Sequence, residues 1–337
     1  MNTTASVPDG EAFALVCREY GDPPDIQRQA LEPSAPLEAD EVLIDVHCAA
    51  FNFTDHLLVQ GRYQERPPTP FVPGLDAAGV VRSVGPRATR FKPGDKVISS
   101  GVVGAWSTRL VAPEHRLVPV PARVGLADAV GSINSHLTAY HGLLDRARLQ
   151  AGERVLVLGA NGAVGKACVQ IAGHAGAEVY TAARGDGDTF RLARQDGDHG
   201  PTVPAGELKQ GLRELLGRQG ADVVVDPVGD RFTEAAVRNL AWRGRLLVVG
   251  FAAGDIPHIP TNLLLLKGCG ILGVYCGGLL IQETDAFTRQ LAAMLELMGS
   301  GVLTASPQEL VSAHDFQQAW SRFSSAPRGT KVVLSFA

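Results

Sequence analysis

Short runs of alternating apolar and polar residues dominate the first third of the chain. Residues 41–49 alternate in this way, and 79–85 and 95–99 are short runs rich in β-branched residues. Proline–glycine pairs at 73–74 and 93–94 interrupt these runs, as is typical of turns between strands. The pattern predicts an irregular, β-rich domain.

From about residue 126 the pattern changes to helices that alternate with buried strands. The apolar runs lie at 155–158, 178–183, 222–226 and 246–250, and the helical stretches between them include 163–175 and 232–240. Strands that are apolar on both faces and are joined by helices form a parallel sheet covered on both sides. This part of the chain is therefore predicted to be a doubly wound domain.

The remaining elements complete this second domain and return to the first. Residues 197–207 offer only a short Thr202-Val203 nucleus broken by two prolines, which predicts an abbreviated edge strand. The segment 266–275 is expected to be the last strand of the sheet. Amphipathic helices follow at 285–298 and at about 315–323, and then a final strand, KVVLSF, that we expect to return to the first domain.

Length and composition agree with this division. At about 150 residues per domain, 337 residues correspond to about two domains, and 45% apolar residues can fill their cores. We expect a discontinuous first domain at 1–126 and 278–337, and a second domain at 127–277.

The charge pattern excludes several classes of partner. Lysine and arginine number 31 and the acids 35, a net charge of −4, so no basic field favours nucleic acid. Apolar runs such as 262–266 are far shorter than the ~18 residues that span a bilayer. Residues 1–12 lack a basic stretch followed by an apolar one, which argues against a secretory signal. The five cysteines form no C-x-x-C pair and are expected to be small buried residues in the reducing cytoplasm.

The strongest motif is the stretch VLVLGANGAVGKACVQIA, in which a buried strand runs through a glycine-rich turn into a helix. Glycine lets the backbone turn sharply and approach a pyrophosphate, while the helix N-terminus faces the anion. In this context the glycines predict a dinucleotide site, although a tight turn without a ligand is an alternative. The expected contacts are Gly159, Asn161, Gly162, Ala163, Val164 and Gly165.

The end of the next strand indicates which dinucleotide binds. An acid there would bind the ribose hydroxyl of NAD, but this strand ends in Ala183 and Arg184. A guanidinium can fork onto a 2′-phosphate, so NADPH is preferred. Asp186 and Asp188 keep NAD possible if the loop folds back. The arginines within 191–194 are expected on a helix, as solvated surface charges.

With these motifs in this order, the chain resembles the medium-chain dehydrogenase/reductase superfamily, and within it the zinc-independent quinone oxidoreductase branch. The matching stretches are AAFNFTDHLLVQGRYQERPPTPFVPGLDAAGVVRSVG, RFKPGDKV, HLTAYHGL, GERVLVLGANGAVG, DVVVDPVG, GRLLVVGFAAG and GTKVVL. The resemblance implies an α/β chain in which a GroES-like, β-rich catalytic domain accompanies a Rossmann domain with a doubly wound parallel sheet.

The metal ligands of the zinc-dependent members are missing from this sequence. Those enzymes resemble this chain but hold zinc with a cysteine, the histidine of a G-H-E segment and a further residue. Here the first position is Asn52 and the segment reads Gly74-Leu75-Asp76, in which leucine cannot bind a metal. We therefore expect no metal.

The resemblance also implies site residues. Asn52 matches a polar residue beside the nicotinamide, and Tyr63 matches a tyrosine near the substrate of related enoyl thioester reductases; loop capping and a structural role are the alternatives. Leu57 stands where many quinone reductases carry a tyrosine. His56, nearest to this site, is expected to be an exposed loop histidine. Further matches to cofactor-contacting positions are Asn134, Thr138, Gly250, Phe251, Ala252 and Lys331.

Three functions follow as hypotheses. The first is an NADPH-dependent, zinc-independent reductase that transfers hydride to a quinone or another α,β-unsaturated carbonyl compound. The second is an enoyl-CoA or acryloyl-type thioester reductase, and the third is a cofactor-binding member with non-redox activity. The resemblance also implies a homodimer, in which the segment 268–275 pairs edge to edge with its copy.

Overall fold

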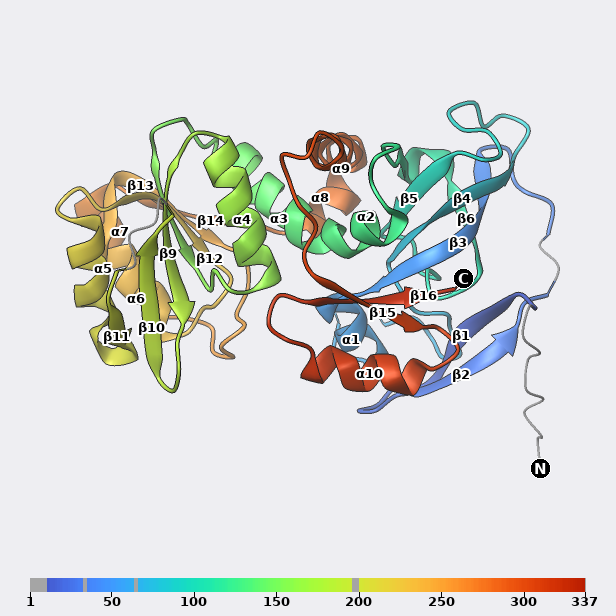
Figure 1. Cartoon of the computed structure of the whole chain (residues 1–337), viewed down its shortest axis with the longest axis horizontal. Helices are drawn as coiled ribbons and strands as arrows, with labels where there is room; N and C mark the ends of the chain where they lie inside the picture. Colours follow the sequence, from blue (N-terminus) through green and yellow to red (C-terminus); the bar gives the residue numbers. More distant parts are fainter. Residues whose placement is uncertain (1–10, 33–34, 64–65, 196–199, 337) are drawn as a thin grey trace. The chain divides into compact units, whose positions relative to one another are not determined.

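The computed structural model describes residues 11–32, 35–63, 66–195 and 200–336. The chain divides into two compact units (Figure 1): unit 1 contains Met1–Ile133 and Leu279–Ala337, and unit 2 contains Asn134–Gly278. The prediction about a secretory signal concerns residues 1–12, most of which lie outside the described residues.

Unit 1 is built on a mostly antiparallel sheet in the order β15-β16-β3-β4-β5-β7, with β6 paired to β3. Its strands are β3 (Glu41–Phe51), β4 (Asp76–Val84), β5 (Lys96–Ser100), β6 (Arg109–Pro113), β7 (Leu117–Pro119), β15 (Gln308–Ser312) and β16 (Lys331–Ser335), and β1 (Phe13–Glu19) and β2 (Asp25–Ala30) form a separate hairpin. The predicted β-rich domain is confirmed. So is the return of the final strand, because Val332 pairs with Phe51.

Aromatic packing holds two helices of unit 1, α1 and α10, on this sheet. The helices are α1 (Phe53–Val59), α2 (Leu126–Ser132), α9 (Thr284–Gly299), α10 (Phe316–Ser325) and the short 3-10 turn η1 (Glu114–Arg116), while α8 (Cys276–Gln282) spans the boundary of the two units. Phe51 stacks on Phe323 with ring centroids 4.7 Å apart and meets Trp106 edge-on at 5.0 Å. His56 stacks on Trp320 at 4.6 Å and on Phe323 at 4.8 Å. The expectation of an exposed loop histidine was wrong, because His56 lies on α1 inside this cluster.

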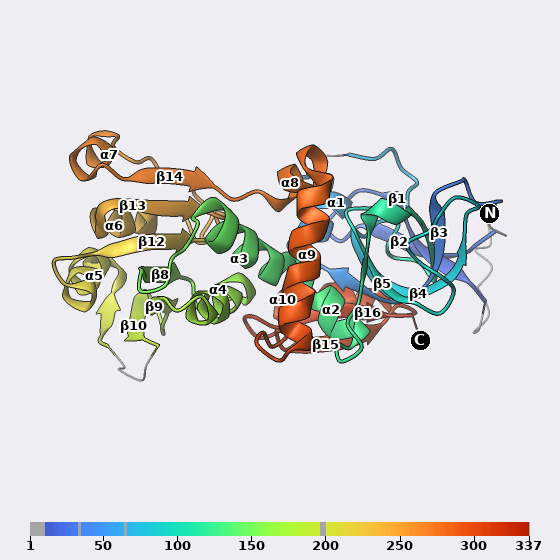
Figure 2. The ribbon, with the colours of Figure 1, turned by 90° about the horizontal axis from the view of Figure 1, so that it is seen from above.

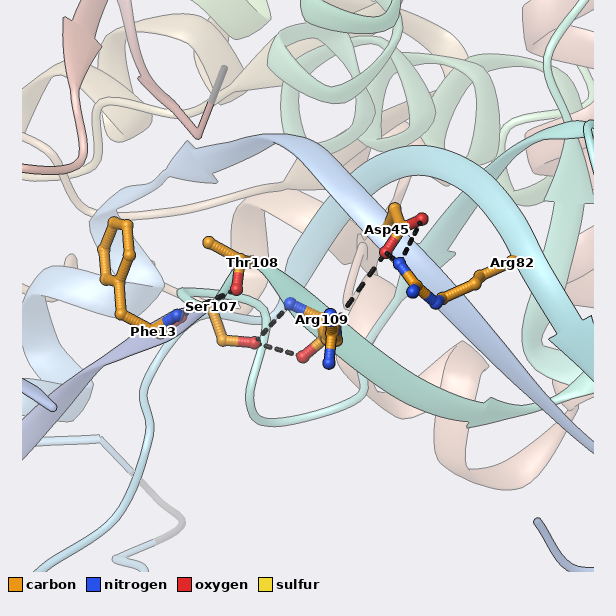
Figure 3. Close-up of polar contacts among 6 residues, drawn as sticks. All are labelled: Phe13, Asp45, Arg82, Ser107, Thr108 and Arg109. Atoms are coloured by element: carbon orange, nitrogen blue, oxygen red, sulfur yellow. Dashed lines mark hydrogen bonds and ion pairs between the residues drawn. The ribbon is translucent and has the colours of Figure 1, made fainter. Parts of the chain in front are cut away.

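Polar contacts join β1 and the central strands (Figure 3). The backbone N–H of Phe13 donates to Thr108 Oγ1 at 3.0 Å, which ties β1 to the segment before β6. On the neighbouring strands, Asp45 pairs with Arg82 at 3.1 Å and with Arg109 at 3.9 Å. These ion pairs are substantially exposed, so each contributes about 0–1 kcal/mol.

Unit 2 contains a seven-stranded sheet in the order β11-β10-β9-β8-β12-β13-β14. The strands are β8 (Arg154–Leu158), β9 (Glu178–Arg184), β10 (Thr189–Arg194), β11 (Thr202–Pro204), β12 (Ala221–Asp226), β13 (Leu240–Val248) and β14 (Gly270–Gly273). The five strands from β9 to β14 run parallel. Leu156, Leu158 and Val224 enter one core cluster, and the alternate residues Val155 and Val157 are equally buried. Both faces are therefore covered, as predicted for a doubly wound sheet.

Helices pack on both faces of this sheet (Figures 1 and 2). They are η2 (Ile133–Leu137), α3 (Thr138–Tyr140), η3 (His141–Arg146), α4 (Ala163–His174), η4 (Ala205–Glu207), α5 (Leu208–Leu216), α6 (Arg231–Arg238) and α7 (Asn262–Lys267). Helices α3 and α4 pack together, and α5 packs with α6. The stretch HLTAYHGL, residues 136–143, runs from the π-helical segment η2 through α3 into a second π-helical segment, η3.

The segment after β9 differs from the prediction. Arg191 and Arg194 were expected to lie on a helix, but residues 189–194 form β10, which runs antiparallel to β9 with Phe190 opposite Arg184. Phe190 and Leu192 are buried, while Arg191 between them is exposed, which is the alternation of a half-buried strand. The predicted abbreviated edge strand is confirmed as β11, which pairs with β10.

Two further observations concern the whole described chain. No helix within the described residues is long and apolar enough to cross a bilayer. All five cysteines are free thiols, three of them buried and two half-buried.

Candidate active site

The glycine-rich turn joins β8 to α4 in unit 2. Gly159 has a φ of 64°, a left-handed conformation that favours glycine, and Gly162 is the N-cap of α4. A Cβ on Gly165 would lie 2.4 Å from the carbonyl oxygen of Gly159, so only glycine lets the helix start this close to the turn. The first N–H groups of α4 lack partners within the helix and point out of its N-terminal end, as an anion site requires.

The other residues predicted for this turn lie beside these glycines. Asn161 is exposed at the tip of the turn, and Ala163 and Val164 are the first residues of α4. The turn is held against the neighbouring strand, because the N–H of Gly159 donates to the carbonyl of Ala182 on β9 at 2.8 Å. This bond links the turn to the end of β9.

The end of β9 presents a cation. Ala183 is buried, whereas Arg184 is exposed and has no ion pair among the residues that the structure describes. A four-residue connection, 185–188, then leads to β10, and within it Asp188 binds Nη2 of Arg231 at 3.0 and 2.9 Å. Arg231 starts α6, so this ion pair holds the hairpin loop against the neighbouring helix. The guanidinium of Arg184 remains available, and the carboxylate of Asp188 does not.

The loop after β13 lies against the loop after β12. The N–H of Gly250 donates to the carbonyl of Asp226 at 3.4 Å, and the N–H of Ala252 donates to that of Pro227 at 3.1 Å. Phe251 is 39% exposed. These three residues therefore lie at the carboxyl ends of adjacent parallel strands, where ligands bind in open sheets.

Asn134 and Thr138 lie together on the helical segment that begins unit 2. Thr138 Oγ1 donates to the carbonyl of Asn134 at 2.6 Å and lies 3.6 Å from Cys276 Sγ. The first contact is a bond to the backbone one turn earlier, so it occupies the threonine hydroxyl within the helix.

A second polar site lies in unit 1, across four adjacent strands of its sheet. Lys331 Nζ donates to Asn52 Oδ1 at 2.8 Å, and Asn52 Nδ2 donates to Asp76 Oδ2 at 2.8 Å. Ser100 Oγ donates to the other oxygen of Asp76 at 2.5 Å. We call these four residues, Lys331, Asn52, Asp76 and Ser100, the polar row.

The sheet register brings the polar row together. Val332 pairs with Phe51, so Lys331 at the start of β16 lies beside Asn52, the residue directly after β3. Asp76 pairs with Ser100 directly, at the start of β4 and the end of β5. The four polar side chains therefore lie at the same end of four adjacent strands, three within the strands and Asn52 directly after β3.

Asp55 supports the polar row from α1. Its Oδ2 accepts the N–H of Asn52 at 2.8 Å, and its Oδ1 accepts the N–H of Leu75 at 3.1 Å. Asn52 precedes the first residue of α1, so the first bond caps the helix from its third position. Asn52 and Asp55 are 1% and 0% exposed, respectively.

Burial shifts the ionisation of this cluster. It raises the pKa of Asp55 to about 8, and the nearby charge of Asp76 adds to the rise. Burial also raises the pKa of Asp76 and lowers the pKa of Lys331. Two carboxyl groups share one ammonium, so the fully ionised set would carry a buried net charge of −1. Uptake of one proton near neutral pH removes that charge.

The structure groups the predicted residues into two sets. Lys331, predicted as a cofactor contact, is hydrogen-bonded to Asn52, while Tyr63 is half-buried in the loop after α1 and is not part of the polar row. Sequence reasoning missed Asp55, Asp76 and Ser100 as site residues. The signal for Asp55 was the N-x-x-D spacing of a capping box at a helix start.

The fold is that of a known class. The family model described as "Alcohol dehydrogenase GroES-like domain" matches residues 38–122, and that described as "Zinc-binding dehydrogenase" matches residues 163–297. The chain belongs to the medium-chain dehydrogenase/reductase superfamily.

Within this superfamily the chain belongs to the quinone oxidoreductase-like branch. Quinone oxidoreductase-like protein 2 of Rattus norvegicus is 34% identical over 323 residues, which cover 96% of this chain and 91% of the relative. Quinone oxidoreductase of Homo sapiens is 29% identical over 283 residues, covering 83% and 84%. The solved structure of a probable oxidoreductase from Mycobacterium abscessus has a TM-score of 0.76 at 28% identity, covering 96% and 99%. The chain is therefore an oxidoreductase of this family.

Proposed function

We propose that this chain is an NADPH-dependent, zinc-independent reductase that transfers hydride to a quinone or another α,β-unsaturated carbonyl compound. Unit 1 is the catalytic domain, and unit 2 binds the cofactor. The observation that carries the proposal is the polar row: at the two positions matched to a cysteine and a histidine ligand of zinc-dependent relatives this chain has Asn52 and Leu75, and the Asn52 amide is bound to Lys331 and Asp76.

A catalytic zinc does not fit the donors at this position. Leu75 offers no donor atom, and the oxygen of Asn52 accepts a hydrogen bond from the Lys331 ammonium. No group of three or more histidine, cysteine, aspartate or glutamate side chains within the described residues has the arrangement of a metal site. Zinc sites need three or four N, S or O donors. The acceptor must therefore be polarised without a metal, which favours a conjugated carbonyl.

A nicotinamide dinucleotide fits the turn of unit 2. Because residue 165 is glycine, α4 can start directly against the turn, where a Cβ would lie 2.4 Å from the carbonyl oxygen of Gly159, and this close approach lets the helix N-terminus face a pyrophosphate. Arg184 supplies a free guanidinium for a 2′-phosphate, and Arg231 keeps the Asp188 carboxylate occupied. These contacts support NADPH over NADH.

The residues of unit 1 would act on the acceptor. The bound nicotinamide supplies a hydride for the β-carbon, and negative charge then develops on the carbonyl oxygen. Asn52 Nδ2 donates one hydrogen to Asp76 and retains a second. Asn52 is 1% exposed, so water competes little for that hydrogen, and a donor in such a place stabilises developing charge more strongly than in water. The final proton comes from solvent or from Tyr63.

Steady-state oxidation of NADPH with a panel of acceptors tests the proposal. We expect turnover with a quinone or an enone, and no dependence on added or chelated zinc. Stoichiometric zinc in the purified protein would contradict the metal-free mechanism.

Arg184→Ala should weaken NADPH binding by about 10- to 100-fold, the effect of losing one or two charge-assisted hydrogen bonds, and should leave NADH binding unchanged. Equal dissociation constants before and after the change would exclude the proposed 2′-phosphate site.

The same panel separates the alternative substrates. Tyr63, together with Leu57 in place of a tyrosine, favours an enoyl-CoA or acryloyl-type thioester reductase as the second candidate. Turnover of a crotonyl thioester without turnover of quinones would select it. Tight NADPH binding without oxidation by quinones, enones or thioesters would select a non-redox member of the family instead.

We also propose that the chain forms a homodimer in the cytoplasm. Strand β14 is an edge strand of the unit 2 sheet, and Leu265 and Leu266 just before it are 80% and 71% exposed. If β14 paired with its copy, the unpaired strand edge and the two exposed leucines would both be covered. Sedimentation should give twice the chain mass, and replacing both leucines with lysine should give the monomer; a monomeric wild type would contradict this arrangement.

A further inference from the structure

Burying the charged groups of the polar row costs free energy, and the fold does not need the row to join its strands. Strands β16, β3, β4 and β5 are already joined by backbone pairing through Val332 and Phe51 and through Asp76 and Ser100. Burying an ammonium and carboxylates is unfavourable, and replacing such buried sets with apolar side chains is often neutral or stabilising. Stability therefore does not explain why these four strand ends carry polar groups.

The polar row determines the orientation of one side chain, the amide of Asn52. An asparagine amide has an oxygen that only accepts and a nitrogen that only donates, and rotation by 180° exchanges the two. The Lys331 ammonium can only donate, and an ionised Asp76 can only accept. Only one orientation satisfies both neighbours, and it is the one observed, with contacts of 2.8 Å on each side.

A separate pair of contacts, made by Asp55, holds the first turn of α1. The N–H of Asn52 is bound to Asp55, and Asp55 is bound in turn to the backbone of Leu75 at the start of β4. Phe53, the next residue, is 63% exposed although its neighbours Phe51 and Asn52 are buried. The helix start therefore presents an exposed aromatic ring from a fixed backbone.

We propose that Lys331 and Asp76 are positioning residues, which hold the Asn52 amide in the single orientation that the reduction needs. The inference rests on the proposed function. It gives Lys331 a role that differs from the cofactor contact expected from sequence, because its ammonium is directed to Asn52. Ser100 completes the row by holding the second oxygen of Asp76, which keeps that carboxylate aligned with Asn52.

Nuclear magnetic resonance of the full chain, labelled with 15N at its six asparagines, reports this positioning directly. The Asn52 side-chain signal is identified by its loss in Asn52→Ala. Hydrogen exchange of that signal is then compared between the wild type and Lys331→Met, alongside kcat and the dissociation constant for NADPH. Lys96→Met is the matched control, because Lys96 is also the first residue of a strand but is exposed.

In Lys331→Met we expect exchange of the Asn52 side-chain hydrogens and kcat each to change by about tenfold or more, the ratio that corresponds to one lost hydrogen bond. The NADPH dissociation constant should stay within about twofold, because the cofactor turn lies in unit 2. Lys96→Met should match the wild type in all three. If Lys331→Met does not fold, Asp76→Asn carries the test: it keeps an acceptor oxygen, removes the charge, and should also speed exchange and lower kcat.

Unchanged Asn52 exchange in the folded variants overturns the proposal. So does a fall in kcat that is matched by an equal rise in the NADPH dissociation constant, because that result describes general loss of structure. If the wild type oxidises NADPH with none of the acceptors tested, only the proposed function is contradicted. The resonance experiment still decides whether Lys331 and Asp76 hold Asn52.

Discussion

Gly165→Ala tests whether the turn between β8 and α4 binds the cofactor. The added Cβ would lie 2.4 Å from the carbonyl oxygen of Gly159 and 2.7 Å from the Cα of Ala160, both of them backbone atoms that no side-chain rotation can move. Ordinary contact begins at 3.4 Å, so the start of α4 must retreat by 3.4 − 2.4, or 1.0 Å.

Two opposing terms set the effect of this change on stability. Overpacking of a tight contact costs about 1–3 kcal/mol. Alanine in place of glycine inside a helix recovers about 1 kcal/mol. We therefore expect a net loss of about 0–2 kcal/mol in the free energy of unfolding, and the variant should remain folded at room temperature because domains of this kind are stable by about 5–15 kcal/mol.

The effect on cofactor binding should be larger. A retreat of 1.0 Å stretches an N–H···O bond from an ordinary ~2.9 Å to about 3.9 Å, beyond hydrogen-bonding distance. Losing one charge-assisted bond to the pyrophosphate costs about 1.5–3 kcal/mol, so the NADPH dissociation constant should rise by about 10- to 150-fold.

Calorimetric titration of NADPH, with urea unfolding of the same samples, measures both quantities. The matched control is Gly206→Ala, because a Cβ at Gly206 meets no atom within 4 Å. An NADPH dissociation constant for Gly165→Ala that equals that of the control would refute the reasoning, since the start of α4 would then not contact the cofactor.

Three further predictions concern charged side chains. Arg231→Ala releases the Asp188 carboxylate beside the proposed 2′-phosphate site and should weaken NADPH binding about two- to tenfold, as measured by titration. Burial holds the pKa of Asp55 near 8 in the folded chain, so stability should fall as pH rises from about 4 to 8, and Asp55→Asn should lack this loss in urea unfolding. Burial lowers the pKa of His56, so the unfolded chain takes up its proton first as the pH falls; the wild type should lose more stability than His56→Leu between pH 7.5 and 5.5, by the shift of the urea midpoint.

Each of these predictions has a contradicting outcome. Adding Asp188→Ala to the Arg231→Ala variant should restore NADPH binding, and a failure to do so assigns the loss to Arg231 itself. Parallel pH curves for the wild type and Asp55→Asn would mean that Asp55 is ionised throughout. Equal urea midpoint shifts for the wild type and His56→Leu would mean that the aromatic cluster tolerates the imidazolium.

Most of the fold was predictable because burial follows the periodicity of the sequence. The alternation at 41–49 became β3, and the apolar runs and the helix between them became β8, α4 and β9. Strand β10 was missed although its sequence, TFRLAR, alternates with a period of two, with Phe190 and Leu192 inside and Arg191 outside. The expectation that a helix follows each strand of a doubly wound sheet outweighed that local signal.

The candidate site was only partly predictable because its contacts join residues far apart in the chain. Asn52 and Lys331 were singled out separately, but their bond depends on the pairing of β16 with β3 across 279 positions. In the segment Gly74-Leu75-Asp76, the sequence indicates only that Leu75 cannot bind a metal. The role of Asp76 arises from its register opposite Ser100. His56 gave no signal in its own segment, since its stacking partners lie on α10.

The two edges of the unit 2 sheet differ in a way that bears on how copies of this chain can assemble. At one edge, β11 is three residues long, Pro201 precedes it and Pro204 ends it, so it offers few N–H groups to an approaching strand. At the other edge, β14 contains no proline. If two copies join β14 to β14 about a twofold axis, the combined sheet ends in a β11 strand on both sides. Growth by strand addition would then stop at two copies, so a sheet that dimerised in this way would be protected against extending into a fibre.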